Sequence, residues 1–185
     1  MIEGSAKRRI KAICNYIKQR LLRPVHDWSM KVLSTIPMDG TFDQEAPIRR
    51  LQKVGHLENY SFNLKSATDR WPLSVIYTLM SMVWGPTLAS SIVNSSLGLN
   101  TFLVMKPIVQ KMREVAFLAG QPLGFYGSWS LFSLSHQTLV WLAAEKAGMK
   151  HPFRDYALLG DDIVISNERV AQECSTLLQK MVPFL

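Results

Sequence analysis

The sequence of 185 residues has little cysteine, few acidic residues and no long unbroken apolar run. Its two cysteines, Cys14 and Cys174, stand far apart and neither has a C-x-x-C neighbour. That pattern argues against a disulfide-built secreted domain and against a cysteine metal site. The N-terminus lacks the apolar core of a signal peptide. The length suits one domain with a hydrophobic core and is too short for two comfortable ones.

An uncharged segment between Arg70 and Lys106 is long enough to cross a bilayer. Prolines, glycines, serines and asparagines interrupt it, and no apolar stretch of about 20 residues survives inside it. We therefore expect no membrane span here. The segment instead predicts two helices packed in a core, with a loop between them.

Positive charge is in excess: 21 Lys and Arg stand against 14 Asp and Glu, which gives a formal net charge of +7. The basic residues are dense near the N-terminus, where no acid occurs among those between Lys7 and Arg23. Such a balance favours a polyanionic partner, either nucleic acid or an anionic membrane. A soluble protein that is merely basic is the alternative.

Hydrophobic periodicity and turn residues predict many helices and a few short strands. The predicted helices are Tyr16–Ile36 (interrupted near Pro24), Pro72–Trp84, Thr101–Leu118, Ser128–Ala147 and Glu168–Met181. The predicted strands are Ile10–Ile13, Tyr60–Leu64, Asp155–Leu159 and Ile163–Ser166. This content indicates an α+β fold, with a small antiparallel sheet backed by helices.

The last two strands flank Gly160-Asp161-Asp162. Because glycine tolerates the positive φ of a tight hairpin, the turn would present two adjacent carboxylates at its tip. Carboxylates are the ligands that Mg²⁺ prefers, and nucleotidyl transfer uses two such ions roughly 3.5–4 Å apart. An ordinary surface turn is the alternative for this tripeptide.

A two-metal site also needs an oxygen donor from another strand. The strand predicted at Tyr60–Leu64 carries Asn63 near its end, and Asp69 follows it closely. Spacing alone equally allows Asp69 to cap the helix expected from Pro72.

Two further segments are candidates for contact with nucleic acid. The loop from Gly120 to Gly127 has glycines that would let its backbone approach a template or ribose, although Ser128 after it is also a reasonable N-cap. The basic residues from Lys7 to Lys11 would suit a triphosphate or a phosphate backbone, and a solvated basic strand is the alternative.

Together and in this order, these segments resemble the RNA-dependent RNA polymerases of mitoviruses, capsidless positive-strand RNA viruses that replicate in mitochondria and have relatives in plant mitochondrial genomes. The resemblance covers nearly the whole chain. Its segments are Lys7-Arg8-Arg9, residues 23–27, residues 36–44, residues 62–70 (first palm motif), residues 120–124 with Ser128-Trp129 (second palm motif), and residues 159–163 (third palm motif).

The resemblance implies a single partial polymerase domain over residues 1–185. Residues 1–58 would be a fingers-like portion and residues 59–185 a palm with motifs A to C, whereas the thumb would be absent. It also implies an RNA template and nucleoside triphosphates as partners, Mg²⁺ or Mn²⁺ as cofactor, and a mitochondrial location. A protein made inside the organelle would need no transit peptide.

The same resemblance assigns roles to individual residues. Asp161 would bind both metal ions with Asp162 assisting, and Asp69 would sense the ribose 2′-hydroxyl that distinguishes RNA from DNA. The nucleotide and template side would be lined by Ser128 and Gly124. The triphosphate would be met by Lys7 and Arg9.

Three departures from the family pattern bear on activity. Asn63 stands where the family has a metal-binding aspartate, and Gly127 where it usually has a small hydroxyl residue. The chain also ends just after the helix that follows Gly-Asp-Asp, before the motif with the general-acid lysine and before the thumb. Because metal assistance is worth several kcal/mol, loss of one bridging carboxylate would slow catalysis on the order of 10²–10⁴-fold.

These observations favour a truncated, catalytically impaired remnant of a viral gene in a mitochondrial genome, and whether the chain is an enzyme stays open. One alternative is an active or split RNA-directed RNA polymerase that uses two Mg²⁺ ions. The other is a non-catalytic RNA-binding protein, held to RNA by its basic N-terminal segment.

Overall fold

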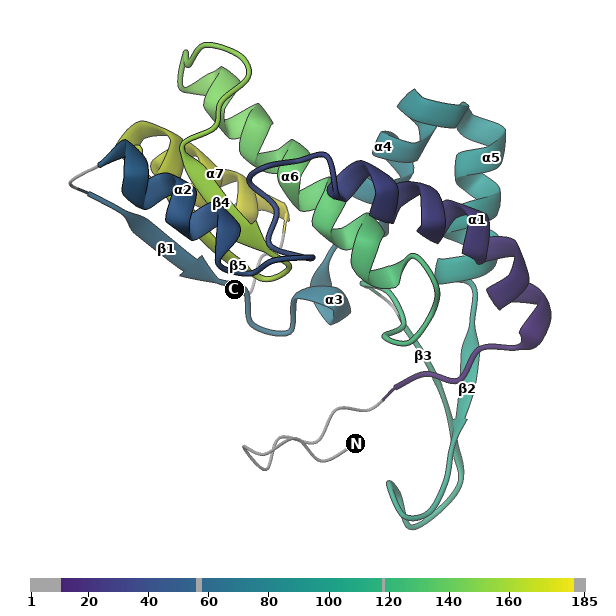
Figure 1. Ribbon diagram of the computed structural model, residues 1–185. Helices are drawn as coiled ribbons and strands as arrows, with labels where there is room; N and C mark the ends of the chain where they lie inside the picture. The colour runs from purple at the N-terminus through teal and green to yellow at the C-terminus, as the bar shows by residue number, and fades with distance from the viewer. Residues whose placement is uncertain (1–10, 56–57, 118, 182–185) are drawn as a thin grey trace.

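The computed structural model describes residues 11–55, 58–117 and 119–181 (Figure 1). Its helices are α1 (Tyr16–Leu33), α2 (Ala46–Val54), α3 (Ala67–Arg70), α4 (Leu73–Trp84), α5 (Pro86–Ser90), the π-helix η1 (Ser91–Gly98), α6 (Ser128–Lys146) and α7 (Glu168–Met181). Its strands are β1 (Tyr60–Asn63), β2 (Thr101–Val104), β3 (Arg113–Ala116), β4 (Tyr156–Leu159) and β5 (Asp162–Ile165). None of the helices in the described ranges could span a membrane.

The three-stranded sheet has the order β1-β5-β4, and both strand pairs are antiparallel. The register places Tyr60 opposite Ile165 at one end of β1 and Asn63 opposite Asp162 at the other. On the outer edge of β4, Leu158 accepts from Gly40 N (2.8 Å) and donates to Met38 O (2.9 Å). The segment after α1 therefore extends the sheet by one bridge.

Helix α6 runs through the centre of the molecule, between the sheet with α2 and α7 on one side and α1, α4 and α5 on the other (Figure 1). It contacts α1, α3, α4 and α7. Its buried residues occur on all sides rather than on one stripe, which is the pattern of a helix enclosed by a core. Two buried serines on α6 are paired with other elements: Ser29 donates to Ser130 (2.6 Å), and Trp71 Nε1 donates to Ser135 (2.8 Å).

The mixture of helices with small antiparallel sheets agrees with the predicted α+β class. The helices predicted from residues 72, 128 and 168 are confirmed as α4, α6 and α7, and three predicted strands are confirmed as β1, β4 and β5. The uncharged segment between Arg70 and Lys106 is more divided than expected. It forms α4, α5, η1 and β2 rather than two helices.

The helix predicted over Thr101–Leu118 is wrong. Residues 101–116 instead form an antiparallel hairpin of β2 and β3. The reason lies in composition, because Thr-Phe-Leu-Val is rich in residues that favour strands, and Pro107 would remove a hydrogen bond from a helix interior.

Two predictions about the N-terminal part are also wrong. The described residues 11–13 of the predicted strand Ile10–Ile13 form no strand, and Ile10 lies outside the described ranges. Helix α1 continues through Pro24 without interruption. Pro24 is exposed, so the carbonyl that its missing N–H leaves without a helical partner can bond to water.

Candidate functional site

The structure brings three predicted site residues together at one end of the sheet. Asn63 ends β1 and lies directly opposite Asp162, which begins β5, and Asp161 precedes Asp162 in the turn. The Asn63 side-chain amide donates a hydrogen bond to Asp162 Oδ1 (2.5 Å). Asn63 and Asp162 are exposed and Asp161 is half-buried, so the group faces solvent.

Two hydrogen bonds to backbone carbonyls hold the turn in place. Leu64 N donates to Asp161 O (3.0 Å), and His136 Nδ1 lies 2.8 Å from Gly160 O. Since that carbonyl can only accept, His136 carries its proton on Nδ1. Both carbonyls are thus occupied within the protein, and the turn is held from β1 and from α6.

Trp129, at the start of α6, packs against this turn. A Cβ atom built on Gly160 would lie 2.1 Å from the Trp129 ring, and Gly160 has φ of +58°. Glycine is therefore required here for its backbone conformation and for the close approach of the indole. The packing joins the second motif of the sequence to the third.

The glycine-rich loop is joined to the segment that carries Asp69. Gln121 N donates to Thr68 O (2.8 Å), and the buried Gln121 side chain donates to Ser128 O (2.8 Å). Gly120 packs so closely on the Asp69 backbone that a Cβ there would lie 2.3 Å from the Asp69 carbonyl carbon. Asp69 is exposed at the end of this contact.

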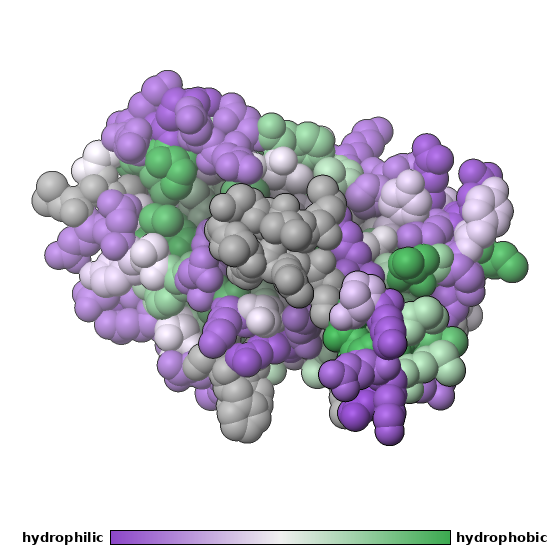
Figure 2. Space-filling view, turned by 90° about the horizontal axis from the view of Figure 1, so that it is seen from below, coloured by the Kyte–Doolittle hydropathy of each residue, from purple (hydrophilic) through white to green (hydrophobic). Residues whose placement is uncertain are grey.

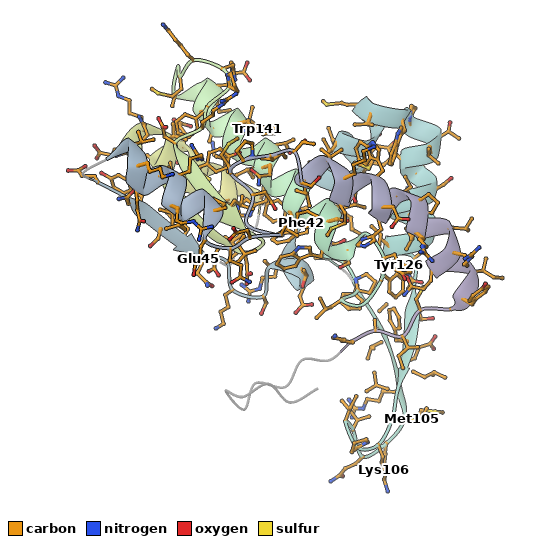
Figure 3. The ribbon with its side chains drawn as sticks, viewed as in Figure 1. Phe42, Glu45, Met105, Lys106, Tyr126 and Trp141 are labelled. Carbon is orange, nitrogen blue, oxygen red and sulfur yellow. The ribbon has the colours of Figure 1, made fainter. Side chains whose placement is uncertain are left out.

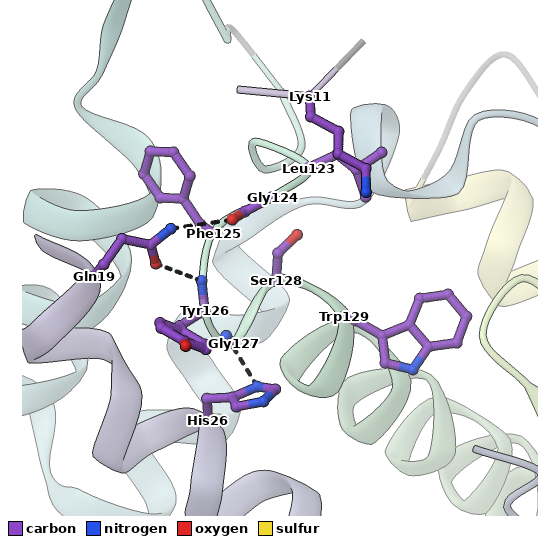
Figure 4. A pocket seen from close by; sticks show the side chains of 10 residues that line it. All are labelled: Lys11, Gln19, His26, Leu123, Gly124, Phe125, Tyr126, Gly127, Ser128 and Trp129. Carbon is purple, nitrogen blue, oxygen red and sulfur yellow. Dashed lines mark hydrogen bonds between the residues drawn. The ribbon is translucent and has the colours of Figure 1, made fainter. Parts of the chain in front are cut away.

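A cavity of about 510 Å³ opens between this loop and the N-terminal part of the chain (Figure 4). Helix α1 holds the loop through Gln19, whose side chain donates to Gly124 O (3.1 Å) and accepts from Tyr126 N (2.9 Å). The lining residues include Lys11, Gly124, Ser128 and Trp129. The cavity therefore reaches from a basic residue to the indole beside the carboxylate turn.

Neither capping alternative is realised. The N-cap of α6 is Gly127, so Ser128 is the first residue of the helix, and the N-cap of α4 is Pro72 without a side-chain bond from Asp69. Ser128 Oγ is buried beside the cavity and has no hydrogen-bond partner in the described part of the chain. A hydroxyl in this state can bond to a ligand.

Lys7 and Arg9 lie outside the described residues. The structure therefore gives no position for the predicted triphosphate contacts, although Lys11, two residues beyond Arg9, lines the cavity.

The donors in the described residues fall short of a two-metal centre. In the described ranges no group of three or more His, Cys, Asp or Glu residues could hold a metal ion. Asp161 and Asp162 supply two carboxylates, whereas Asn63 supplies a neutral amide whose nitrogen faces Asp162. A neutral amide cannot bridge two cations as a carboxylate does.

The sequence reasoning missed His136 and Gln137. His136 is fully buried against Trp71 and Phe132, and its burial lowers the pKa of the imidazole from 6.5 to about 4. Gln137 donates to Asp39 Oδ2 (2.9 Å) and accepts from Tyr156 Oη (2.6 Å). The sequence shows that this long helix carries polar residues among apolar ones, but it does not show which segments they contact.

Comparison with known proteins identifies the family. Residues 2–182 match the family model of the mitovirus RNA-dependent RNA polymerase. The chain belongs to this family. It is 33% identical to the RNA-directed RNA polymerase of Cryphonectria parasitica mitovirus 1 over 184 residues, which is 97% of this chain and 22% of the viral protein.

Two mitochondrial proteins of Arabidopsis thaliana, both described as uncharacterized, are also relatives. The first is 54% identical over 82% of this chain, and the second is 46% identical over 74% of it. The matched regions make up 61% and 67% of the two Arabidopsis proteins. The chain thus spans only part of the length of these relatives, and about a fifth of the viral protein.

Gly160→Ala is expected to destabilise the protein by about 3 kcal/mol, because it combines a positive φ with a clash against Trp129. Gly148→Ala is the matched control, with a φ of +72° and nothing within 4 Å of the added Cβ. We expect that control to cost only about 1 kcal/mol. Urea denaturation of both variants measures the difference, and equal losses would contradict the packing of Trp129 on the turn.

Because of His136, the free energy of unfolding should decrease as the pH is lowered. Its folded pKa of about 4 lies below the ordinary 6.5, so the unfolded chain takes up the proton first. The contribution is fully present above pH 6.5 and is lost on acidification toward pH 4, by up to about 1.4 kcal/mol per pH unit. Urea denaturation across this range should show a flatter profile for His136→Asn, which keeps an N–H donor without titrating. An unchanged profile would refute the assignment.

Proposed function

We propose that this chain is a catalytically impaired mitovirus-type RNA polymerase core, a remnant of a viral gene. The observation that carries the proposal is the pairing of Asn63 with Asp162, at the position where the family resemblance expects a metal-binding aspartate. Family membership supports RNA polymerisation as the type of chemistry. The side-chain amide of Asn63 is the proposed cause of the impairment.

The sheet order supports assignment of residues 59–185 to a palm. Strand β1 is connected through helices to the β4–β5 hairpin, which α7 follows. The resulting sheet order is β1-β5-β4, in which β1 pairs with the last strand, β5. That is the arrangement of a split βαβ unit. Residues 1–58, with α1 and α2, would form a fingers-like portion, since α1 holds the loop beside the cavity through Gln19.

The roles proposed for the site follow from its position. Asp161 and Asp162 would hold Mg²⁺ or Mn²⁺, which when bound lowers the barrier to attack of a 3′-hydroxyl on a phosphoryl group. Ser128 and Gly124 would contact nucleotide or template from the cavity wall, and Asp69 would face the ribose. Lys7 and Arg9 would contact the triphosphate.

We infer a mitochondrial location from the relatives, two of which are mitochondrial proteins. RNA and nucleoside triphosphates are the partners that the family membership supports.

A second candidate function is RNA binding without catalysis. It is supported by the net charge of +7 and by the cavity, whose lining includes both Lys11 and Ser128. Both features are independent of the metal ligands, so RNA affinity would survive the loss of a metal-binding carboxylate at position 63.

Primer extension on an RNA template with Mg²⁺ or Mn²⁺ tests the impaired-polymerase proposal. The natural chain should extend the primer on the order of 10²–10⁴-fold more slowly than Asn63→Asp, which restores the missing charge. Asp161→Ala in the Asn63→Asp background is the control and should be inactive. If the natural chain extends the primer as fast as Asn63→Asp does, and if Asp161→Ala abolishes that extension, the enzyme is intact and the proposal is wrong.

Thermal unfolding provides an arm that needs no catalysis. The carboxylate introduced by Asn63→Asp would face Asp162 with like charge, so the Tm of this variant should lie below that of the natural chain in chelator and rise on addition of Mn²⁺. The natural chain should respond less, because Asn63 already bonds to Asp162. An equal response of both chains to Mn²⁺ would show that position 63 is not a metal ligand.

RNA affinity should depend on salt if the second candidate is correct. Each phosphate contact by Lys or Arg contributes to a negative slope of log affinity against log salt, about 0.7 per contact for single strands. Fluorescence anisotropy with a short single-stranded RNA should therefore show weaker binding as salt rises. Replacing Lys7, Arg8, Arg9 and Lys11 by Gln should flatten that slope, and affinity indifferent to salt would rule out this function.

A further inference from the structure

The β2–β3 hairpin extends away from the rest of the molecule, and Met105 and Lys106 lie at its far end (Figures 1 and 3). Its base is fixed to α1 by Lys18, whose ammonium donates to Asn100 Oδ1 (2.7 Å). Phe102 turns toward the body and contacts Phe117 and Phe125. The distal half of the ribbon projects beyond these contacts, although a two-stranded ribbon alone is marginally stable in water.

Large aliphatic side chains are exposed along this ribbon. The exposed fractions are 63% for Leu103, 53% for Met105, 56% for Ile108 and 67% for Met112. The strand register, continued by one residue, places Met105 opposite Met112 on the same face as Leu103. Seen from below in Figure 2, apolar and polar side chains lie next to each other at this end of the molecule.

Basic residues lie among the aliphatic ones along the distal half of the ribbon. Lys106, Lys111 and Arg113 are all exposed, and Glu114 is the one acidic residue between 101 and 116. An exposed aliphatic surface bordered by cations matches the chemistry of an anionic bilayer, where apolar side chains enter the headgroup region and cations meet the lipid phosphates.

Other occupants fit less well. Single-stranded RNA is held by outward aromatic side chains on which bases stack, whereas Phe102, the aromatic residue of this ribbon, faces inward. A second copy of the chain would bring the same excess of positive charge against itself.

We propose that the tip of the β2–β3 hairpin docks on the surface of an anionic phospholipid bilayer. Met105, Ile108 and Met112 enter the interface, while Lys106, Lys111 and Arg113 contact the phosphates. The contact is peripheral and is independent of polymerase activity, so it goes beyond the proposed function.

Vesicle sedimentation of the full chain tests this proposal. We expect binding to phosphatidylcholine vesicles that contain phosphatidylglycerol and about tenfold weaker binding to phosphatidylcholine alone. The double variant Ile108→Asp/Met112→Asp should bind the anionic vesicles at least about tenfold more weakly than the natural chain does. The triple variant Lys106→Gln/Lys111→Gln/Arg113→Gln should bind both kinds of vesicle equally weakly.

Matched controls separate the hairpin from general properties of the chain. Met82→Asp changes an apolar residue that is 80% exposed on α4, and Lys53→Gln/Lys150→Gln/Lys180→Gln removes three exposed cations elsewhere. Both controls should bind anionic vesicles as the natural chain does, and circular dichroism should show that every variant is folded.

Three results would overturn the proposal. The first is absence of binding to anionic vesicles by the natural chain. The second is an equal loss of binding in the control triple variant, which would mean a general charge effect. In the third, hairpin variants lose affinity for a short RNA but keep vesicle binding, which would identify the hairpin as an RNA contact.

Discussion

Because α6 is enclosed on all sides, several of its polar side chains bond to other segments, and these hydrogen bonds organise the rest of the molecule. Ser130 meets α1 through Ser29, and Gln137 meets both Asp39 and Tyr156. His136 meets the carbonyl of Gly160. Because a buried polar group without a partner costs roughly 1–3 kcal/mol, each bond restricts where α1, the sheet edge and the carboxylate turn can lie.

The same helix connects the two halves of the candidate site. Its first turn carries Ser128 at the cavity and Trp129 on the carboxylate turn, and His136, about two helical turns further along, bonds to that carboxylate turn through Gly160. The cavity wall and the carboxylates are therefore placed by one rigid element. Precision of this kind is what catalysis by positioning needs, and it is present in a chain that carries Asn63 beside the carboxylate turn.

Much of this arrangement could be predicted from local patterns. Apolar runs on either side of Gly160 indicated β4 and β5, and long periodic segments indicated α4, α6 and α7. The segment after Thr101 was misread because a short apolar run fits a helix and a strand equally well. The roles of His136 and Gln137 depend on segments tens of residues away, which no local pattern encodes. The placement of Asn63 opposite Asp162 likewise depends on strand register.

The Asn63–Asp162 hydrogen bond separates folding of the carboxylate turn from the binding of a cation. An aspartate at this position would face Asp162 with like charge and would need a cation for relief, whereas the amide satisfies its neighbour without one. With asparagine at position 63, this end of the sheet can therefore fold without a bound cation. Folding of the carboxylate turn is thereby independent of the supply of divalent cations.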